Sequence, residues 1–194
     1  MSWAIWITGP PGSGKTTLAR GVAAALEARG VAVKVLELDE VRKVVTPAPT
    51  YSEAERELVY RALAYMAKLL TEAGVPVLID ATAHRRAWRE LARSLIPAFA
   101  EVQLLCPIEV CREREGRRRP GYAPRAIYAR AGSHGTTVPG VDVPYEVSLR
   151  AELTLKADEC DRWTQAQEVL YLVRRLSRAA VFQALRVQRR FLCE

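Results

Sequence analysis

The chain has 194 residues, of which 49% are hydrophobic and 26% are charged, a composition typical of a soluble globular protein. This length suits one domain with a sizeable core, so residues 1–194 are expected to form a single unit. No apolar run reaches the roughly 20 residues of a transmembrane helix, and the first predicted strand leaves no room for a signal peptide. Both observations favour a cytoplasmic protein without a membrane partner.

The net charge of +7 comes from 29 basic and 22 acidic side chains, and arginine supplies most of the basic ones. A basic surface can simply be solvated, or it can bind nucleic acid. It can also recognise a small anionic substrate, because the guanidinium fork matches phosphate and sulfate geometry. A phosphate-binding motif near the N-terminus favours the small anion and makes nucleic acid the less favoured partner. The four cysteines form no C-x-x-C pair, so no zinc site is expected.

A strand, a glycine-rich turn and a helix are predicted at the start of the chain. Residues 3–8 are a short apolar run of the kind that forms a buried strand. Residues 17–29 are rich in helix formers and end at Gly30. Between them, Gly9-Pro10-Pro11-Gly12-Ser13-Gly14-Lys15-Thr16 matches the phosphate-binding pattern G-x-x-x-x-G-K-[ST] at every specified place.

This arrangement predicts a P-loop that binds ATP, because free backbone N–H groups and the positive end of a helix point into it. The Lys15 ammonium would reach the β- and γ-phosphates, and the Thr16 hydroxyl would ligate Mg²⁺. The predicted ATP-binding residues are Gly9, Pro10, Pro11, Gly12, Ser13, Gly14, Lys15, Thr16, Thr17 and, from a later helix, Arg114.

The rest of the chain alternates between strands and helices, which predicts a parallel sheet covered on both faces. Strands are expected at residues 31–38, 75–80, 101–106 and 152–156, and helices at 53–73, 85–95, 107–115 and 163–191. Ser52 and Glu55 form a predicted capping box at the start of the first of these helices. The residues expected to face the core from this helix are Leu58, Ala62, Tyr65, Met66, Leu69 and Leu70.

Residues 116–147 are rich in Gly, Pro and Arg and are too long for an ordinary connection. We interpret them as a lid that closes over the nucleotide and excludes water. They include the dense basic cluster Arg117–Arg119. The basic tail at residues 177–194 fits either a packed helix or a dimer contact.

Two carboxylates follow predicted strands, Asp39 after the second strand and Asp80 after the third. Ligands of open α/β sheets bind at the carboxyl ends of the strands. Asp80, together with Thr16, is therefore predicted to hold Mg²⁺ through its bound water, and Asp39 to act as a base or to position the acceptor. A helix N-cap role is the alternative for each.

Several arginines are candidates for binding anions. Arg42 and Arg56 flank the face where an acceptor would lie, while Arg114 and Arg130 bracket the lid and could clamp phosphates. His84 follows the third strand, where a structural hydrogen bond is favoured over a general-acid role.

Between about residue 3 and residue 176 the sequence resembles the adenylyl-sulfate kinase (APS kinase) family. The P-loop is similar to that family's opening, Leu38–Arg42 to its Asp-x-x-Arg segment, and Tyr51–Arg56 to the start of its next helix. The most specific likeness is in the lid. There, Ile127–Ala131 and Gly140–Glu146 resemble the signatures Leu-Tyr-Lys-Lys-Ala and Gly-Ile-Asp-x-Pro-Tyr-Glu.

The resemblance implies transfer of the ATP γ-phosphate to the 3′-hydroxyl of adenylyl sulfate, a step of sulfate assimilation. It also implies a P-loop fold with a five-stranded parallel sheet and, in many members, a homodimer. Asp39 would act near the acceptor hydroxyl. The residues that would bind the acceptor are Asp39, Arg42, Arg56, Arg130 and Val141.

Three stretches depart from the family pattern. Ala81-Thr82-Ala83-His84 stands where the family has Phe-Ile-Ser-Pro, so that its phenylalanine and its serine (here Ala83) are both missing. Val59 replaces the asparagine of Arg-x-x-Asn, and Val138 with Pro139 replaces the phenylalanine before Gly-Ile. Stacking of a base on an aromatic ring is worth about 1–3 kcal/mol, so the missing rings leave a second interpretation open. In it, the same fold and ATP chemistry serve another small alcohol or nucleotide. A nucleotide-binding regulator or nucleic-acid-binding protein is the third and least favoured interpretation.

Overall fold

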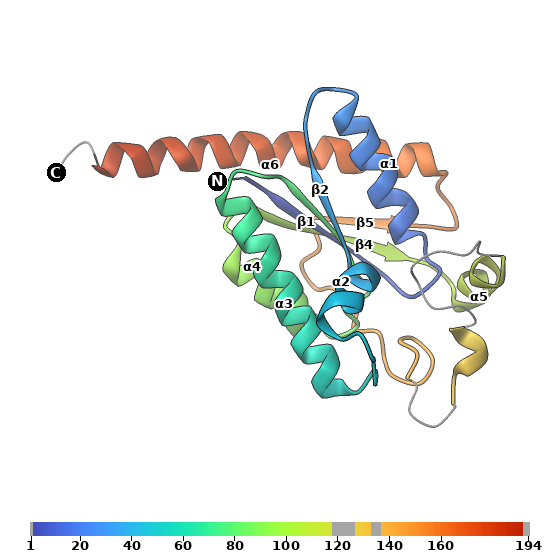
Figure 1. Cartoon of the computed structure of the whole chain (residues 1–194). Helices are drawn as coiled ribbons and strands as arrows, with labels where there is room; N and C mark the ends of the chain where they lie inside the picture. The colour runs from blue at the N-terminus through green and yellow to red at the C-terminus, as the bar shows by residue number, and fades with distance from the viewer. Residues whose placement is uncertain (1, 118–126, 133–136, 192–194) are drawn as a thin grey trace.

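Five parallel strands form the centre of the molecule in the order β2-β3-β1-β4-β5 (Figure 1). The strands are β1 (Ala4–Thr8), β2 (Lys34–Glu37), β3 (Val77–Asp80), β4 (Phe99–Leu105) and β5 (Leu153–Lys156). The structure is a computed structural model that describes residues 2–117, 127–132 and 137–191, with side chains of the last helix described as far as Arg178. All four neighbouring strand pairs are parallel, which confirms the predicted sheet.

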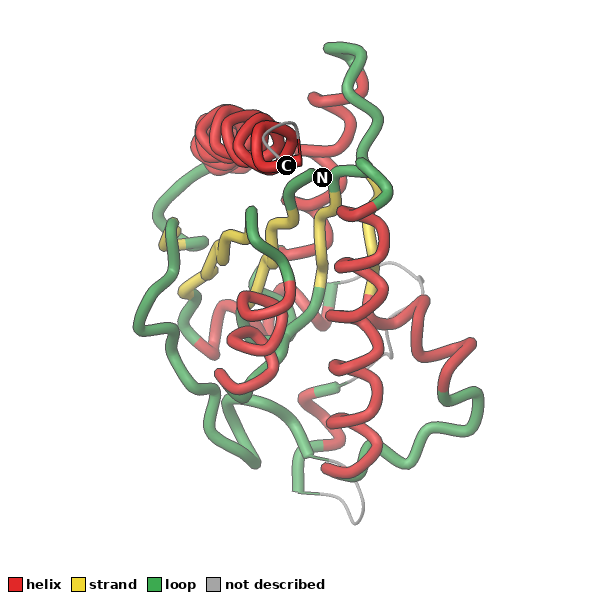
Figure 2. The backbone as a smooth tube through the Cα atoms, turned by 90° about the vertical axis from the view of Figure 1, so that its left-hand side faces the viewer, coloured by secondary structure: helices red, strands yellow, loops and turns green. Residues whose placement is uncertain are grey.

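Helices cover both faces of this sheet, as Figure 2 shows. They are α1 (Lys15–Glu27), α2 (Leu38–Val45), α3 (Glu53–Glu72), α4 (Arg86–Leu95), α5 (Ile108–Gly116) and α6 (Arg162–Phe191), with a 3₁₀ turn η1 (Tyr128–Arg130). In the described part of the chain, no helix combines the length and the apolar character needed to cross a bilayer.

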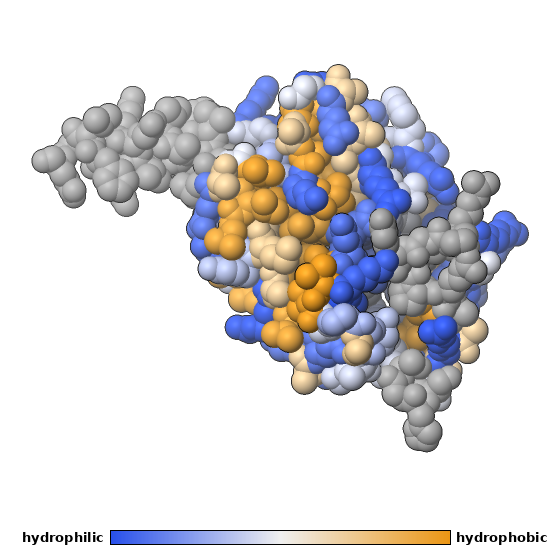
Figure 3. Space-filling model, in the orientation of Figure 1, coloured by the Kyte–Doolittle hydropathy of each residue, from blue (hydrophilic) through white to orange (hydrophobic). Residues whose placement is uncertain are grey.

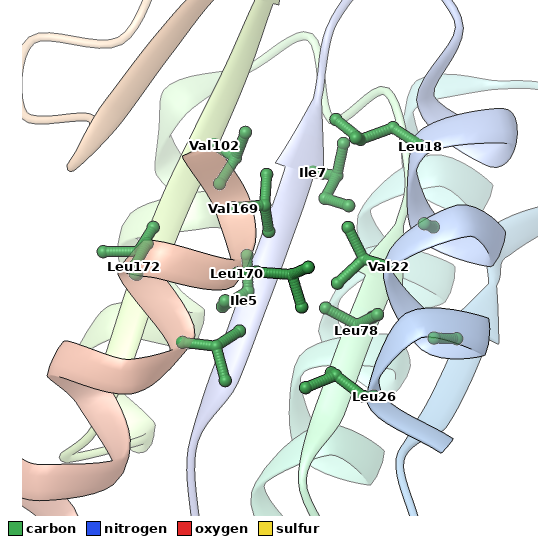
Figure 4. Packing of buried hydrophobic residues seen from close by; sticks show 14 of the residues in the cluster. Ile5, Ile7, Leu18, Val22, Leu26, Leu78, Val102, Val169, Leu170 and Leu172 are labelled. Atoms are coloured by element: carbon green, nitrogen blue, oxygen red, sulfur yellow. The ribbon is translucent and has the colours of Figure 1, made fainter. Parts of the chain in front are cut away.

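The first core lies between the sheet and the pair α1 and α6 (Figure 4). Ile5 and Ile7 of β1 point to this side and meet Val22 of α1 and Val169 of α6, all fully buried. Strands that are covered on both faces read as continuous apolar runs. This explains why residues 3–8 could be recognised as a strand without any alternation of polar and apolar residues.

The second core lies between the opposite face and the pair α3 and α4. Trp6 from β1 donates a hydrogen bond through Nε1 to the Ala81 carbonyl, at 3.0 Å. The rings of Tyr60 and Trp88 stack with centroids 4.2 Å apart and join α3 to α4. These large rings fix the position of the segment that follows β3, which borders the site described below.

The buried face of α3 differs from the expected one. Leu58 is 56% exposed, Tyr65 53% and Leu69 47%, so the prediction that these side chains face the core is wrong. Met66 is also exposed, and Ala62 and Leu70 are only partly buried. The side chains that do face inward from α3 are Arg56, Val59, Tyr60, Leu63, Ala64, Ala67 and Thr71.

The error has a physical cause. The helix carries apolar residues on two faces, and helical periodicity alone does not choose between them. The face that includes the small side chains Ala64 and Ala67, together with Tyr60 and Leu63, packs inward, and the face with Leu58, Tyr65 and Leu69 remains outside. Figure 3 shows the resulting hydrophobic surface over α3.

The second strand is shorter than predicted, and the helix α2 follows it directly. Residues 34–37 form β2, and Glu37 is the N-terminal flanking residue of α2. Asp39 and Arg42 therefore project from a helix rather than from a strand end and a loop. Asp39 belongs to the first turn of α2, where a carboxylate interacts favourably with the helix dipole.

At the start of α3, one of the two hydrogen bonds of the predicted capping box is present. The Glu55 N–H donates to Ser52 Oγ at 3.3 Å, as expected. The Glu55 carboxylate does not return to the Ser52 N–H. Instead, Oε2 accepts hydrogen bonds from the Thr50 hydroxyl at 2.7 Å and from the Tyr51 N–H at 3.2 Å.

A buried ion pair joins α4 to the middle of the sheet. Arg89 and Glu101 are each 1% exposed, and Nε of Arg89 lies 2.9 Å from Oε1 of Glu101. The same guanidinium donates to the carbonyls of Ala83 and Glu146, the latter at 2.5 Å. One side chain thus fastens α4, β4, the segment after β3 and the end of the lid.

We expect Arg89→Met to lower the free energy of unfolding by about 3–5 kcal/mol, because it leaves the Glu101 charge buried without its partner. The matched control is Arg61→Met, which removes an exposed i,i+4 pair with Glu57 of 3.2 Å. That change should stay within about 0.5 kcal/mol of the wild type. Urea denaturation measures both, and equal losses for the two variants would contradict this account.

Candidate active site

The P-loop has the backbone geometry that phosphate binding requires. Gly14 precedes α1 in a left-handed conformation, with φ of 104°. Gly12 has φ of 81°, and a Cβ atom there would lie 2.3 Å from the Cys111 carbonyl oxygen. Only glycine allows the loop to pack this closely against α5. The loop therefore sits between the start of α1 and the helix that leads into the lid.

Two hydrogen bonds to carbonyl groups organise this loop. Lys15 is 9% exposed, and its Nζ donates to the Pro10 carbonyl at 2.9 Å. Tyr128 of η1 donates through its hydroxyl to the Pro11 carbonyl at 2.6 Å. The lid signature that contains Tyr128 is therefore in direct contact with the P-loop.

One small cavity brings together the side chains predicted to act on the phosphate. Lys15, Thr16, Asp39 and Asp80 all line it. Burial raises the pKa of the Asp80 carboxyl, while the nearby Lys15 charge and a hydrogen bond from the Thr16 hydroxyl act in the opposite direction. Sequence positions that are far apart thus meet at the carboxyl ends of β1 and β3.

The oxygen donors in this cavity fit Mg²⁺. Thr16 and Asp80 offer a hydroxyl and a carboxylate beside the phosphate loop. Magnesium typically takes one or two protein oxygens and fills its octahedron with water and substrate phosphates. Among the described residues, no group of three or more His, Cys, Asp or Glu side chains could hold an ion without such help.

The predicted acceptor residues line a second pocket, with one exception. Asp39, Arg42, Arg56 and Arg130 all border it. Val141 is 39% exposed and does not line this pocket, so its role in acceptor binding stays a prediction without geometric support.

Protein groups hold both buried arginines of this pocket in place. Nη1 of Arg42 lies 2.7 Å from Glu55, and its guanidinium sits 5.1 Å from the centre of the Tyr51 ring. Arg56 donates from Nε to the Tyr51 carbonyl at 2.9 Å, and from Nη2 to the Thr137 carbonyl at 2.7 Å. Arg56 thereby ties the lid to α3.

Sequence analysis missed the two aromatic rings in the acceptor pocket. Tyr51 and Tyr60 both line it, opposite a wall that includes Val138. Tyr51 has a left-handed backbone, with φ of 55°, held by Glu55 and Arg56. A positive φ at tyrosine leaves no signal in the sequence. Tyr51, however, lies within the stretch that resembles the family and could have been recognised there.

A third, larger pocket of about 850 Å³ lies on the other side of the P-loop. Gly14, Thr17 and Arg114 line it, as do residues from the start of α6. Arg114 donates from Nη2 to the Ala157 carbonyl at 3.0 Å and so bridges α5 to the segment after β5. Small-molecule sites commonly enclose about 300–1,000 Å³, so this space suits the nucleoside part of ATP.

The three pockets adjoin one another and share lining residues. Gly12 and Thr16 border both the large pocket and the phosphate cavity. Pro11, Asp39 and Thr82 border both the phosphate cavity and the acceptor pocket. Asp39 therefore stands where a phosphate from one side and an acceptor from the other would meet.

Hydrogen bonds from the last part of the predicted lid hold it against the site. Asp142 accepts from the Gly132 and Val138 N–H groups at 3.0 and 2.7 Å, and Tyr145 is 2.8 Å from Thr8 at the end of β1. Burial raises the pKa of Tyr145 to about 12, so its hydroxyl stays protonated.

Part of the predicted lid lies outside the described residues, including Arg118, Arg119, most of the Gly116–Pro124 stretch and His134. Arg117 is described, and it pairs with Glu113 at 2.7 Å on the surface.

His84 is buried outside the phosphate cavity, but the structural hydrogen bond expected of it is not found. Its Nδ1 has no hydrogen-bond partner among the described residues, and its Nε2 lies 3.7 Å from Glu53 Oε1. The His84 side chain is 2% exposed, its ring meets the Trp88 ring edge-on at 4.9 Å, and it does not line the phosphate cavity. Burial, helped by the Arg56 charge and opposed by Glu53, lowers the pKa of His84 to about 4. The imidazole is therefore neutral near pH 7 and carries no proton to donate as an acid.

The lowered pKa predicts an acid-dependent loss of stability. Below about pH 6.5 the unfolded chain binds a proton that the folded chain does not accept until about pH 4, so the free energy of unfolding falls across this window. We expect the wild type to lose about 2–3 kcal/mol more than His84→Gln between pH 7 and pH 4. Urea denaturation at both pH values measures this, and parallel losses in the two proteins would contradict it.

Comparison with known proteins shows the family to which the sequence is similar. The sequence model described as Adenylylsulphate kinase matches residues 1–156. A probable adenylyl-sulfate kinase of Archaeoglobus fulgidus is 38% identical over 165 residues, covering 84% of this chain and 100% of that protein. An adenylyl-sulfate kinase of Synechococcus sp. is 39% identical over 159 residues, covering 80% of this chain and 85% of that protein.

A solved structure shares the fold. The APS kinase CysC of Mycobacterium tuberculosis, in complex with AMPPNP and APS, superimposes with a TM-score of 0.78 at 30% identity. The match covers 89% of this chain and 98% of that one.

Proposed function

Because the chain belongs to the adenylyl-sulfate kinase family, we propose that it transfers the γ-phosphate of ATP to the 3′-hydroxyl of adenylyl sulfate. The observation that carries this proposal is the position of Asp39, which lines both the phosphate cavity and the acceptor pocket. A carboxylate at such a junction can orient a hydroxyl toward the phosphate and accept its proton.

In the proposed reaction, ATP lies on one side of Asp39 and the acceptor hydroxyl on the other. The acceptor oxygen forms a bond to the γ-phosphorus as the bond from that phosphorus to the β–γ bridging oxygen breaks. ADP leaves with the electron pair, and the hydroxyl proton passes to Asp39. The Lys15 ammonium stabilises the charge on the phosphate oxygens, as a fixed cation in a site that excludes water.

The metal would sit beside Thr16 and Asp80, where it would neutralise charge on the ATP phosphates. Burial raises the pKa of the Asp80 carboxyl although the Lys15 charge opposes this shift. A divalent cation nearby would favour the ionised carboxylate, because opposite charges lower the pKa of an acid.

The acceptor pocket offers the groups that an anionic nucleotide requires. Arg42, Arg56 and Arg130 supply positive charge, and the Tyr51 ring offers aromatic surface in place of the missing family residues. Stacking of a base on such a ring is worth about 1–3 kcal/mol. The Tyr60 ring is 1% exposed and already stacks on Trp88. The pocket formed by the described residues measures about 120 Å³, which is below the usual range for a ligand site. Thr137–Pro139 form part of its wall.

Self-association stays a prediction from the family resemblance. The exposed side chains of Leu58, Tyr65, Met66 and Leu69 on α3 supply an apolar surface that is compatible with it. Sedimentation velocity of the purified chain measures the oligomeric state directly.

The acceptor is tested by measuring ADP release from ATP with and without adenylyl sulfate. We expect strong stimulation by adenylyl sulfate and no turnover in Lys15→Ala, which lacks the phosphate-binding ammonium. Lys34→Ala, at the exposed start of β2, is the matched control and should keep full activity. If other small alcohols stimulate and adenylyl sulfate does not, the acceptor assignment is wrong and the alternative acceptor class is favoured.

We expect Asp39→Asn to lower kcat by about 100-fold or more, because an amide of the same shape cannot accept the proton. Affinity for ATP should change little, since Asp39 acts on the acceptor side of the phosphate. The control is Glu40→Gln, which alters the neighbouring exposed carboxylate in the same turn of α2. Steady-state kinetics with calorimetry of ATP binding separates the two effects, and an unchanged kcat would remove Asp39 from the chemistry.

A further inference from the structure

One tryptophan of this protein is left in solvent. Of the four tryptophans in the sequence, Trp3, Trp6 and Trp88 are 3%, 0% and 1% exposed, whereas Trp163 is 72% exposed. Burying an indole removes a large apolar surface from water and is strongly favourable. The exposure of Trp163 therefore points to an interaction that the isolated chain does not satisfy.

The backbone that carries Trp163 is firmly held. The Asp161 carboxylate accepts hydrogen bonds from the N–H groups of Trp163 and Thr164 at 2.8 and 3.0 Å, and so caps the first turn of α6. The Gln165 side chain adds a bond to the Cys160 carbonyl at 2.7 Å. The indole thus projects from a fixed point rather than from a loose loop.

This fixed point borders the large pocket beside the P-loop. Trp163 lines that pocket together with Gly14 and Thr17 from the start of α1 and Arg114 from α5. Figure 1 shows the first turns of α6 beside α1. One end of the pocket therefore contains the phosphate-binding residues, and an exposed aromatic ring belongs to the same pocket.

We propose that the indole of Trp163 is the surface on which the base of the bound nucleoside triphosphate stacks. This inference rests on the proposed function, which places the triphosphate of ATP in the P-loop. A purine offers more area to an aromatic ring than a pyrimidine does. Trp163 therefore acts as a specificity-determining residue that favours ATP over CTP, while the phosphates are held independently of the base.

The first test uses the natural fluorescence of the full chain. Because the other three indoles are buried, acrylamide quenching reports mainly on Trp163. Magnesium ATP is expected to shield the indole from acrylamide. Inorganic tripolyphosphate, which fills the P-loop but has no base, is expected to leave the quenching unchanged.

The second test uses calorimetry of nucleotide binding. Trp163→Ala is expected to weaken ATP binding by about 5- to 150-fold, to reduce the preference for ATP over CTP, and to leave tripolyphosphate binding unchanged. Trp163→Phe should retain much of the ATP affinity, because a phenyl ring can still stack. Tyr171→Ala is the matched control: it removes a ring that is 62% exposed on the same helix but does not line the pocket.

The outcomes separate this inference from the proposed function. If the wild type binds ATP and Trp163→Ala binds it equally well, or if ATP fails to shield the indole, the stacking role is wrong and the kinase assignment stands. If the wild type binds neither ATP nor tripolyphosphate, the proposed function fails and the role of Trp163 fails with it.

Discussion

The acceptor side of this molecule depends on one buried guanidinium. Arg89 pairs with Glu101 on the central strand β4 at 2.9 Å, and it also bonds the carbonyls of Ala83 and Glu146. These partners belong to segments that are far apart in the chain but must meet at the carboxyl edge of the sheet. The 2.9 Å contact between Nε and Oε1 is an ion pair without hydrogen-bond geometry, so the two carbonyls supply the hydrogen bonds that this buried charge requires. The requirement to satisfy Arg89 therefore also fixes where the lid rejoins the sheet.

Much of the fold and of the phosphate half of the site could be predicted from sequence, because the signals there are local. The P-loop pattern specifies its own backbone, and apolar runs bounded by glycine, proline and charged residues mark strands and helices. The structure places Lys15, Thr16 and Asp80 in one cavity. The reason is that β1 and β3 are neighbouring parallel strands, so their carboxyl ends meet at the same edge of the sheet.

The remaining features could not be predicted because they depend on tertiary contacts. Which face of α3 turns toward the core depends on which of its two apolar faces fits against α4. Asp39 lies on a helix because β2 ends early at Glu37, and nothing local distinguishes that end from an extended strand. The left-handed backbone of Tyr51 exists only because Glu55 and Arg56 hold it. The exposure of Trp163 is likewise a property of the folded surface.

The bonds of Arg56 have a consequence for how an anion is held. Its Nε and Nη2 groups are engaged by the Tyr51 carbonyl and by Thr137. A sulfate or phosphate that binds through the adjacent Nε and Nη2 N–H groups in a two-point contact would displace these bonds. A bound anion and Thr137 would then compete for the Arg56 guanidinium.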